Sequence, residues 1–117
     1  MGYYTNYSLT IEDRQGEVID KYSEKYAAVY NRLTDRFNEM IGTKDALDAL
    51  IHDYAEWKWY NYEKDMFAIA LDYPDFIFTL SGRGEEPEDI WVEQFYQDQH
   101  ARSVAQFIPP DDNPLGL

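Results

Sequence analysis

The chain contains no cysteine, which excludes a disulfide framework and thiol chemistry. It also lacks any apolar run approaching the roughly 18 residues that a membrane-spanning helix needs. Its first residues, Met-Gly-Tyr-Tyr-Thr-Asn-Tyr, have neither the charged region nor the apolar segment of a signal peptide. These absences predict a cytoplasmic protein that has no contact with a membrane.

Basic residues are scarce as well. The 117 residues include 23 acids and only ten lysines and arginines, for a net charge of −13. The imbalance is greatest in residues 72–117, which hold ten acids and only two bases, Arg83 and Arg102. Such a surface repels nucleic acid and anionic membrane, and it attracts basic partners over a Debye length of roughly 8–10 Å. Solubility alone is the competing explanation of this excess.

Aromatic residues, in contrast, are abundant. They make up 17% of the chain, with 11 tyrosines and three tryptophans, and hydrophobic residues reach 44%. A chain of this length and composition predicts a single domain with one core, over residues 1–108. Residues 109–117 begin Pro-Pro-Asp-Asp-Asn-Pro and cannot pair in a sheet, so we expect them to form an extended arm.

In the N-terminal half, hydrophobic periodicity predicts one strand and two helices. Residues 3–12 alternate between apolar and polar side chains, which is typical of a half-buried strand. Apolar spacings of three and four over residues 17–41 predict a long helix, with Gly42 as its C-terminal stop. Thr43 is predicted to cap a second helix. Residues 54–60 fit either a short strand or the last turn of that helix.

The C-terminal half predicts one more helix and a meander of strands. Asn61 is the expected N-cap of a helix that ends before Pro74, because the residue before proline avoids the helical region. Three apolar runs then predict strands at residues 76–80, 90–96 and 101–108, with a turn at 97–100 between the last two. The resulting order predicts an α+β fold: a mainly antiparallel sheet of four to five strands with two or three helices packed on one face.

Several segments match a pattern found in small proteins of bacteriophages and prophages. They are the opening Gly-Tyr-Tyr-Thr-x-Tyr-Ser-Leu at residues 2–9, Lys-Trp-Tyr at 58–60 before an acid-rich helix, Tyr-Pro-Asp at 73–75, and Phe-x-Leu-x-Gly-x-Gly-Glu-Glu-x-x-Asp-x-Trp at 78–91. On these segments the chain resembles that loose family, and the resemblance implies a phage accessory role. Arg83 stands where the pattern has an acid, and Asn61-Tyr62 where it has Asp-His, so no function tied to those positions is carried over.

Two possible ligand motifs are weak. Asp48, His52 and Glu56 are spaced to share one helix face, and such residues bind divalent metals. Three ligands on one helix without a second cluster are more typical of a solvated face. Gly82 and Gly84 form a Gly-x-Gly after a strand, but they lack the third glycine and the helix that phosphate binding requires.

No catalytic arrangement emerges either. His100 has no serine or aspartate at a spacing that suggests a triad. The paired carboxylates of residues 85–89 lie in a predicted exposed turn, without the apolar pocket that raises a carboxyl pKa. The sequence therefore predicts a protein that is not an enzyme and has no cofactor and no metal.

The acidic surface of the C-terminal half remains as the candidate site. Residues on one face of a strand stand about 6.6–6.8 Å apart. Phosphates of one DNA strand rise about 3.4 Å per nucleotide, so carboxylates on strands, turns and a helix can imitate a phosphate track. A tryptophan beside them would supply an aromatic anchor. The predicted partner-binding residues are Asp72, Asp75, Glu85, Glu86, Glu88, Asp89, Trp91, Glu93 and Asp98.

Charge and resemblance together predict a phage-encoded inhibitor of a host nucleic-acid-handling protein, of anti-CRISPR or anti-restriction type. Its partner would be a basic host protein such as a nuclease, a CRISPR effector or a restriction enzyme. The inhibitor itself would bind no nucleic acid and would act as a monomer or homodimer in the cytoplasm of the infected bacterium. Two alternatives stay open: a binding module that uses exposed aromatics, and a small-molecule or metal-binding accessory protein.

Overall fold

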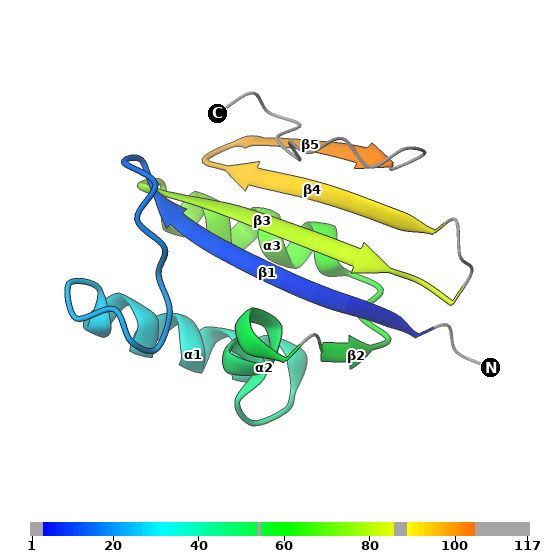
Figure 1. Cartoon of the computed structure of the whole chain (residues 1–117), viewed down its shortest axis with the longest axis horizontal. Helices are drawn as coiled ribbons and strands as arrows, with labels where there is room; N and C mark the ends of the chain where they lie inside the picture. The colour runs from blue at the N-terminus through cyan, green and yellow to red at the C-terminus, as the bar shows by residue number, and fades with distance from the viewer. Residues whose placement is uncertain (1–3, 54, 86–88, 105–117) are drawn as a thin grey trace.

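The structure is a computed structural model that describes residues 4–53, 55–85 and 89–104. Figure 1 shows a five-stranded sheet with three helices against one of its faces, which confirms the predicted α+β fold. The strand order is β2-β1-β3-β4-β5, and all neighbours are antiparallel. In chain order the elements are β1 (Thr5–Asp13), α1 (Ala27–Ile41), α2 (Ala46–His52), β2 (Ala55–Trp57), α3 (Tyr62–Asp72), β3 (Phe76–Arg83), β4 (Ile90–Tyr96) and β5 (Gln99–Val104).

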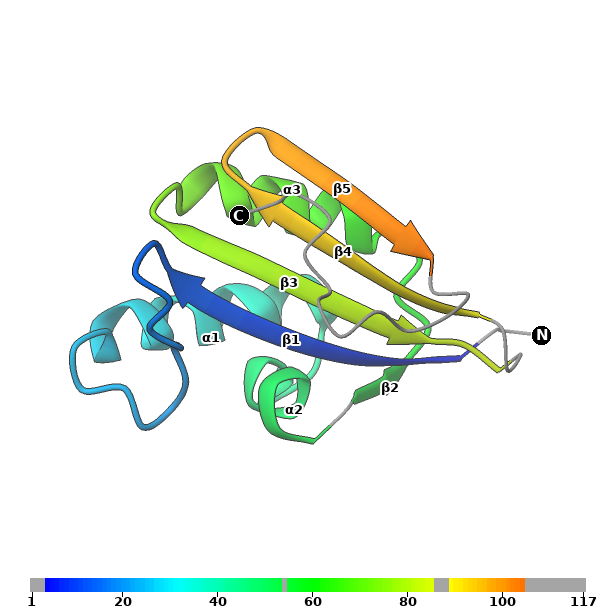
Figure 2. The same ribbon diagram turned by 45° about the horizontal axis from the view of Figure 1, so that its top comes forward.

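The core lies between the sheet and the helices. Leu9 and Ile11 of β1 are fully buried, and they pair in the ladder with Leu80 and Phe78 of β3. Helix α2 packs on β1, and α3 packs on β3 and β4 (Figure 2). Because side chains alternate along a strand, one face of the sheet carries this apolar set. Within the described residues, no helix is both long enough and apolar enough to cross a membrane.

The predicted helix over residues 17–41 is wrong in its first part, since α1 begins only at Ala27. The chain before it stays attached to β1: the N–H of Ile19 donates to the carbonyl of Ile11 at 2.8 Å. The carboxylate of Asp13 accepts two backbone N–H groups of the intervening turn. These bonds satisfy the backbone without a helix, and Ile19 is buried against the sheet edge instead.

The helix ends follow the sequence only in part. Gly42 ends α1 as predicted, in the left-handed conformation that glycine adopts without strain, and its N–H donates to the Asn38 carbonyl. Thr43 does not cap α2. The Asn38 side chain takes that role, because its Oδ1 accepts the N–H of Ala46 at 2.9 Å. Asn61 directly precedes α3 as predicted, although its side chain makes no capping bond with the described residues.

The structure decides the open alternative at residues 54–60 and corrects the predicted turn at 97–100. Within residues 54–60, β2 is a short strand that pairs with the start of β1. The β4–β5 connection is tighter than the predicted four-residue turn: Gln97, at φ 56°, and Asp98 make the turn, and Gln99 and His100 already belong to β5. The remainder of the last predicted strand and the predicted arm, residues 105–117, lie outside the described residues.

Candidate functional site

The predicted acidic surface divides between two opposite ends of the sheet (Figure 1). The loop between β3 and β4 carries Glu85, Glu86, Glu88 and Asp89, of which Glu86 and Glu88 lie outside the described residues. The other end carries Asp72, Asp75 and Asp98, all exposed. The eight residues of β3 separate the two ends by about 25 Å, at about 3.3 Å per residue. The described acids therefore do not form one continuous track.

Trp91 and Glu93 do not belong to the surface, which corrects the prediction. Trp91 is 4% exposed and Glu93 is 0% exposed, because both side chains lie on the face that α3 covers and contact its Tyr62. The Trp91 ring lies directly over its ladder partner Gly82, where a Cβ atom would overlap the ring. The Gly82 of the Gly-x-Gly sequence therefore serves close packing of this indole.

At the end where β1 begins and β3 finishes, acids and exposed aromatics lie together. The N–H of Tyr4 donates to Oε2 of Glu85 at 2.6 Å, and the Tyr4 ring is 45% exposed. Tyr60 is 70% exposed. The backbone carbonyl of its neighbour Trp59 accepts a hydrogen bond from the Tyr7 hydroxyl. We call Tyr4, Tyr60, Glu85 and Asp89 the acidic–aromatic end.

Electrostatics supports this grouping. Burial raises the pKa of the Tyr7 hydroxyl, and the nearby groups Asp89 and Tyr60 raise it further. The ammonium of Lys58 lies 4.6 Å from the centre of the Tyr4 ring, a cation–π contact. The same small region therefore presents carboxylates, tyrosine rings and one lysine.

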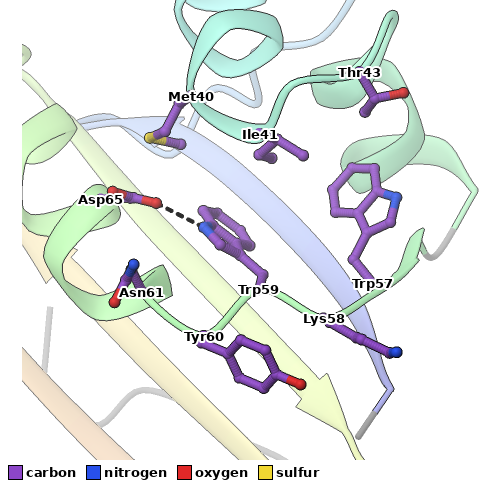
Figure 3. A pocket seen from close by; sticks show the side chains of 9 residues that line it. All are labelled: Met40, Ile41, Thr43, Trp57, Lys58, Trp59, Tyr60, Asn61 and Asp65. Carbon is purple, nitrogen blue, oxygen red and sulfur yellow. Dashed lines mark hydrogen bonds between the residues drawn. The ribbon is translucent and has the colours of Figure 1, made fainter. Parts of the chain in front are cut away.

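A pocket of about 380 Å³ adjoins this end, between the C-terminus of α1 and the segment that joins β2 to α3 (Figure 3). Trp57 and Trp59 turn their rings toward α1, whereas Lys58 and Tyr60 point away from it. The Trp59 indole N–H donates to Asp65 at 2.8 Å, so its polar edge is satisfied. The lining residues are Met40, Ile41, Thr43, Trp57, Lys58, Trp59, Tyr60, Asn61 and Asp65. An aromatic floor with a few polar groups suits a small apolar ligand or a partner side chain.

A second polar cluster lies on the helix-covered face, where β4 and β5 meet α3. The buried carboxylate of Glu93 accepts a hydrogen bond from the Tyr62 hydroxyl at 3.1 Å and contacts Nδ1 of His100 at 3.0 Å. Burial raises the pKa of Glu93, and the neighbouring Glu63 raises it further, while the His100 contact opposes them. Burial also raises the pKa of Tyr62, and the charge of Glu93 adds to that.

Sequence reasoning missed this cluster because its members are distant in the chain. Tyr62 and Glu93 are 31 residues apart, and only the fold brings them together. The available signal was the position of Glu93, which shares a strand face with Trp91 and Phe95. A carboxylate between two aromatic residues on one face of a strand indicates a buried acid with a dedicated partner.

Asp48, His52 and Glu56 do not share one helix face, so that prediction is wrong. Helix α2 ends at His52, and Glu56 lies on β2. Asp48 instead pairs with Lys21 at 3.3 Å and contacts His52 at 3.8 Å. Elsewhere, Asp72 forms an ion pair with Arg36 of α1.

Comparison with known proteins gives no match. No family model matches the chain, and no curated protein or solved structure matches it significantly.

Proposed function

We propose that this chain is a phage-encoded inhibitor that binds a basic, nucleic-acid-handling host protein, of CRISPR or restriction type, and competes with that protein's nucleic acid. The observation that carries the proposal is the acidic–aromatic end, where Tyr4 and Tyr60 are exposed near Glu85 and Asp89 on a chain of net charge −13. The resemblance of the sequence to phage accessory proteins also supports it.

The chemistry of this end fits a surface of lysines and arginines. In the sequence, four of the five residues 85–89 are acids and none is a base. Carboxylates steer a basic partner and pair with its guanidinium groups, as phosphates do. Exposed tyrosines add contact area at low entropic cost, and such rings are frequent interface hot spots.

The two acidic ends are too far apart to act as one contact surface, so each has a different role in this proposal. A distance of about 25 Å corresponds to about seven nucleotides along one DNA strand, and the buried Glu93 presents no carboxylate on the surface between them. At the far end, Asp72 is already paired with Arg36. The acidic–aromatic end therefore makes the contact in this proposal, and Asp75 and Asp98 contribute long-range attraction.

The test is capture of host proteins on the immobilised chain, followed by elution with duplex DNA or RNA. Release of the captured protein by nucleic acid is the expected result, since both ligands would occupy one basic site. Two matched neutralisations refine it: Glu85→Gln with Asp89→Asn, and Asp75→Asn with Asp98→Asn. Both remove two negative charges, but only the first should abolish capture. Equal losses from the two pairs, or a partner that nucleic acid does not displace, would contradict the proposal.

A binding module that acts through aromatics is the second candidate, and the pocket beside Trp57 favours it. Apolar contact tolerates about 0.5 M salt, whereas a screened charge interface does not. A partner that stays bound at that salt concentration and is lost on Tyr60→Ala would favour this candidate over nucleic-acid mimicry.

A further inference from the structure

Three side chains from three different elements converge at the sheet edge formed by β4 and β5. Glu63 comes from the first turn of α3, Glu93 from the middle of β4 and His100 from β5. One potential ligand atom from each lies within 4.8 Å of the other two. Their combination of one imidazole and two carboxylates is a donor set that divalent transition metals accept.

The central ligand, Glu93, is held in place before any ion arrives. It is fully buried, and the Tyr62 hydroxyl occupies its Oε1. Its Oε2 is left facing Nδ1 of His100 at 3.0 Å. That is a hydrogen-bond distance, and widening it by about 0.4 Å would give the spacing of two ligand atoms on one tetrahedral ion. A hydrogen bond to the second oxygen of a ligating carboxylate is the usual way in which proteins orient such a ligand.

The imidazole is also positioned by packing. The His100 ring stacks on Phe95, with centroids 5.8 Å apart and planes at 12°, and it meets the edge of Phe67 at 5.6 Å. Arg102, the ladder partner of Glu93, lies over the Trp91 ring, 5.1 Å from its centre. The carboxylates of Glu63 and Glu93 both lie close to the His100 imidazole. A cation bound between them would offset the repulsion between the two carboxylates.

We propose that Glu63, Glu93 and His100 form a binding site for a divalent transition-metal ion, with Zn²⁺ as the best fit. Bond lengths of about 2.0–2.2 Å place tetrahedral ligands about 3.4 Å apart, so the site closes by a small movement of the exposed Glu63. Three protein ligands leave a fourth position for water. The bound ion links α3 to β4 and β5 and is independent of the acidic–aromatic end.

The test is titration of tag-free, chelator-treated protein with Zn²⁺, followed by calorimetry and by the imidazole signals in NMR spectra. We expect one-to-one binding that shifts His100. Glu63→Gln, on an exposed side chain, and His100→Gln each remove a direct ligand, so each should weaken binding by more than the roughly tenfold that loss of an outer-shell partner costs. Mg²⁺ should not compete, because it prefers oxygen ligands in octahedral geometry.

The second histidine supplies the matched control. His52 also lies beside a carboxylate, that of Asp48, at 3.8 Å, so His52→Gln removes an equivalent pair and should leave Zn²⁺ affinity unchanged. Three results would overturn the proposal: the absence of one-to-one binding, a loss of binding in His52→Gln, or full affinity in Glu63→Gln. In each case His100 and Glu93 would be an ion pair only.

Discussion

At the residue scale, Asp13 shows how a single carboxylate redirects the backbone. Its Oδ1 accepts the N–H groups of Gln15 and Glu17, both at 2.9 Å, and its Oδ2 accepts the hydroxyl of Tyr26. These hydrogen bonds hold the pKa of Asp13 below its usual range, with the backbone N–H of Glu17 contributing most, followed by Tyr26 and Gln15. This charge therefore stabilises the turn that replaces the first part of the predicted helix.

We predict that Asp13→Asn lowers the free energy of unfolding at neutral pH and flattens its dependence on acid. The folded pKa is below the unfolded value of about 3.9, so the contribution is complete above that value. It disappears as the pH falls through the lower folded pKa. Urea unfolding of both proteins across this range measures it. A difference between them that does not change with pH would contradict the assignment.

Two tyrosines provide a matched pair of hydroxyl deletions. The hydroxyl of buried Tyr30 has no hydrogen-bond partner among the described residues, and burial raises its pKa to about 12. The hydroxyl of Tyr62, in contrast, donates to buried Glu93. Tyr30→Phe should change the free energy of unfolding by less than about 1 kcal/mol, and Tyr62→Phe should lower it by about 1–3 kcal/mol. The reverse order in chemical denaturation would show that the Tyr62 bond is not a stabilising contact.

At the element scale, the strands were predictable and the connections were less so. Alternation fixes the burial of Leu9, Ile11 and Phe78 from neighbouring residues alone. The start of α1 and the cap of α2 depend instead on the Ile19 bond to β1 and on the Asn38 side chain, contacts that local periodicity does not encode. Helical spacing over residues 17–41 was therefore right about the residues from Ala27 onward and wrong before them.

The same limit applied to the sites. Composition correctly identified an excess of acids. Strand alternation shows which residues share a face but not which face the helices cover, so Glu93 was wrongly predicted to be exposed. Glu93 is buried because α3 covers that face of the sheet, where Tyr62 contacts it. The tight turn at Gln97 pairs β5 with β4 and brings His100 beside it. The cluster of Glu63, Glu93 and His100 could not be predicted either, because it also depends on where α3 places Glu63 in the fold.

The contact between β3 and β4 gives an element-scale prediction. A Cβ atom at Gly82 would overlap the buried Trp91 ring, so Gly82→Ala should lower the free energy of unfolding by about 1–3 kcal/mol. Ser81→Ala, one residue earlier and on the other face of the sheet, is the control and should have a smaller effect. Thermal unfolding compares the two. If Gly82→Ala is tolerated as well as Ser81→Ala, the indole does not lie over this glycine in solution.

At the scale of the whole molecule, the charge of −13 acts together with the shape of the sheet. Acids gather at its two ends, and exposed aromatics join them at the end that includes Tyr4 and Glu85. A protein so charged attracts basic surfaces at long range, and the aromatic contacts add short-range affinity. We therefore predict that partner binding has both an electrostatic and an apolar component, the first being larger.

The salt dependence of partner binding distinguishes a carboxylate interface from an apolar one. The measurement is the dissociation constant of the nucleic-acid-displaceable partner from about 50 to 200 mM salt. Carboxylates that take the place of phosphates on a basic site predict a steep loss of affinity over this range, as for nucleic acid itself, and a shallower slope for Glu85→Gln with Asp89→Asn. An affinity that does not change with salt, in the original chain and in that variant, would contradict the claim.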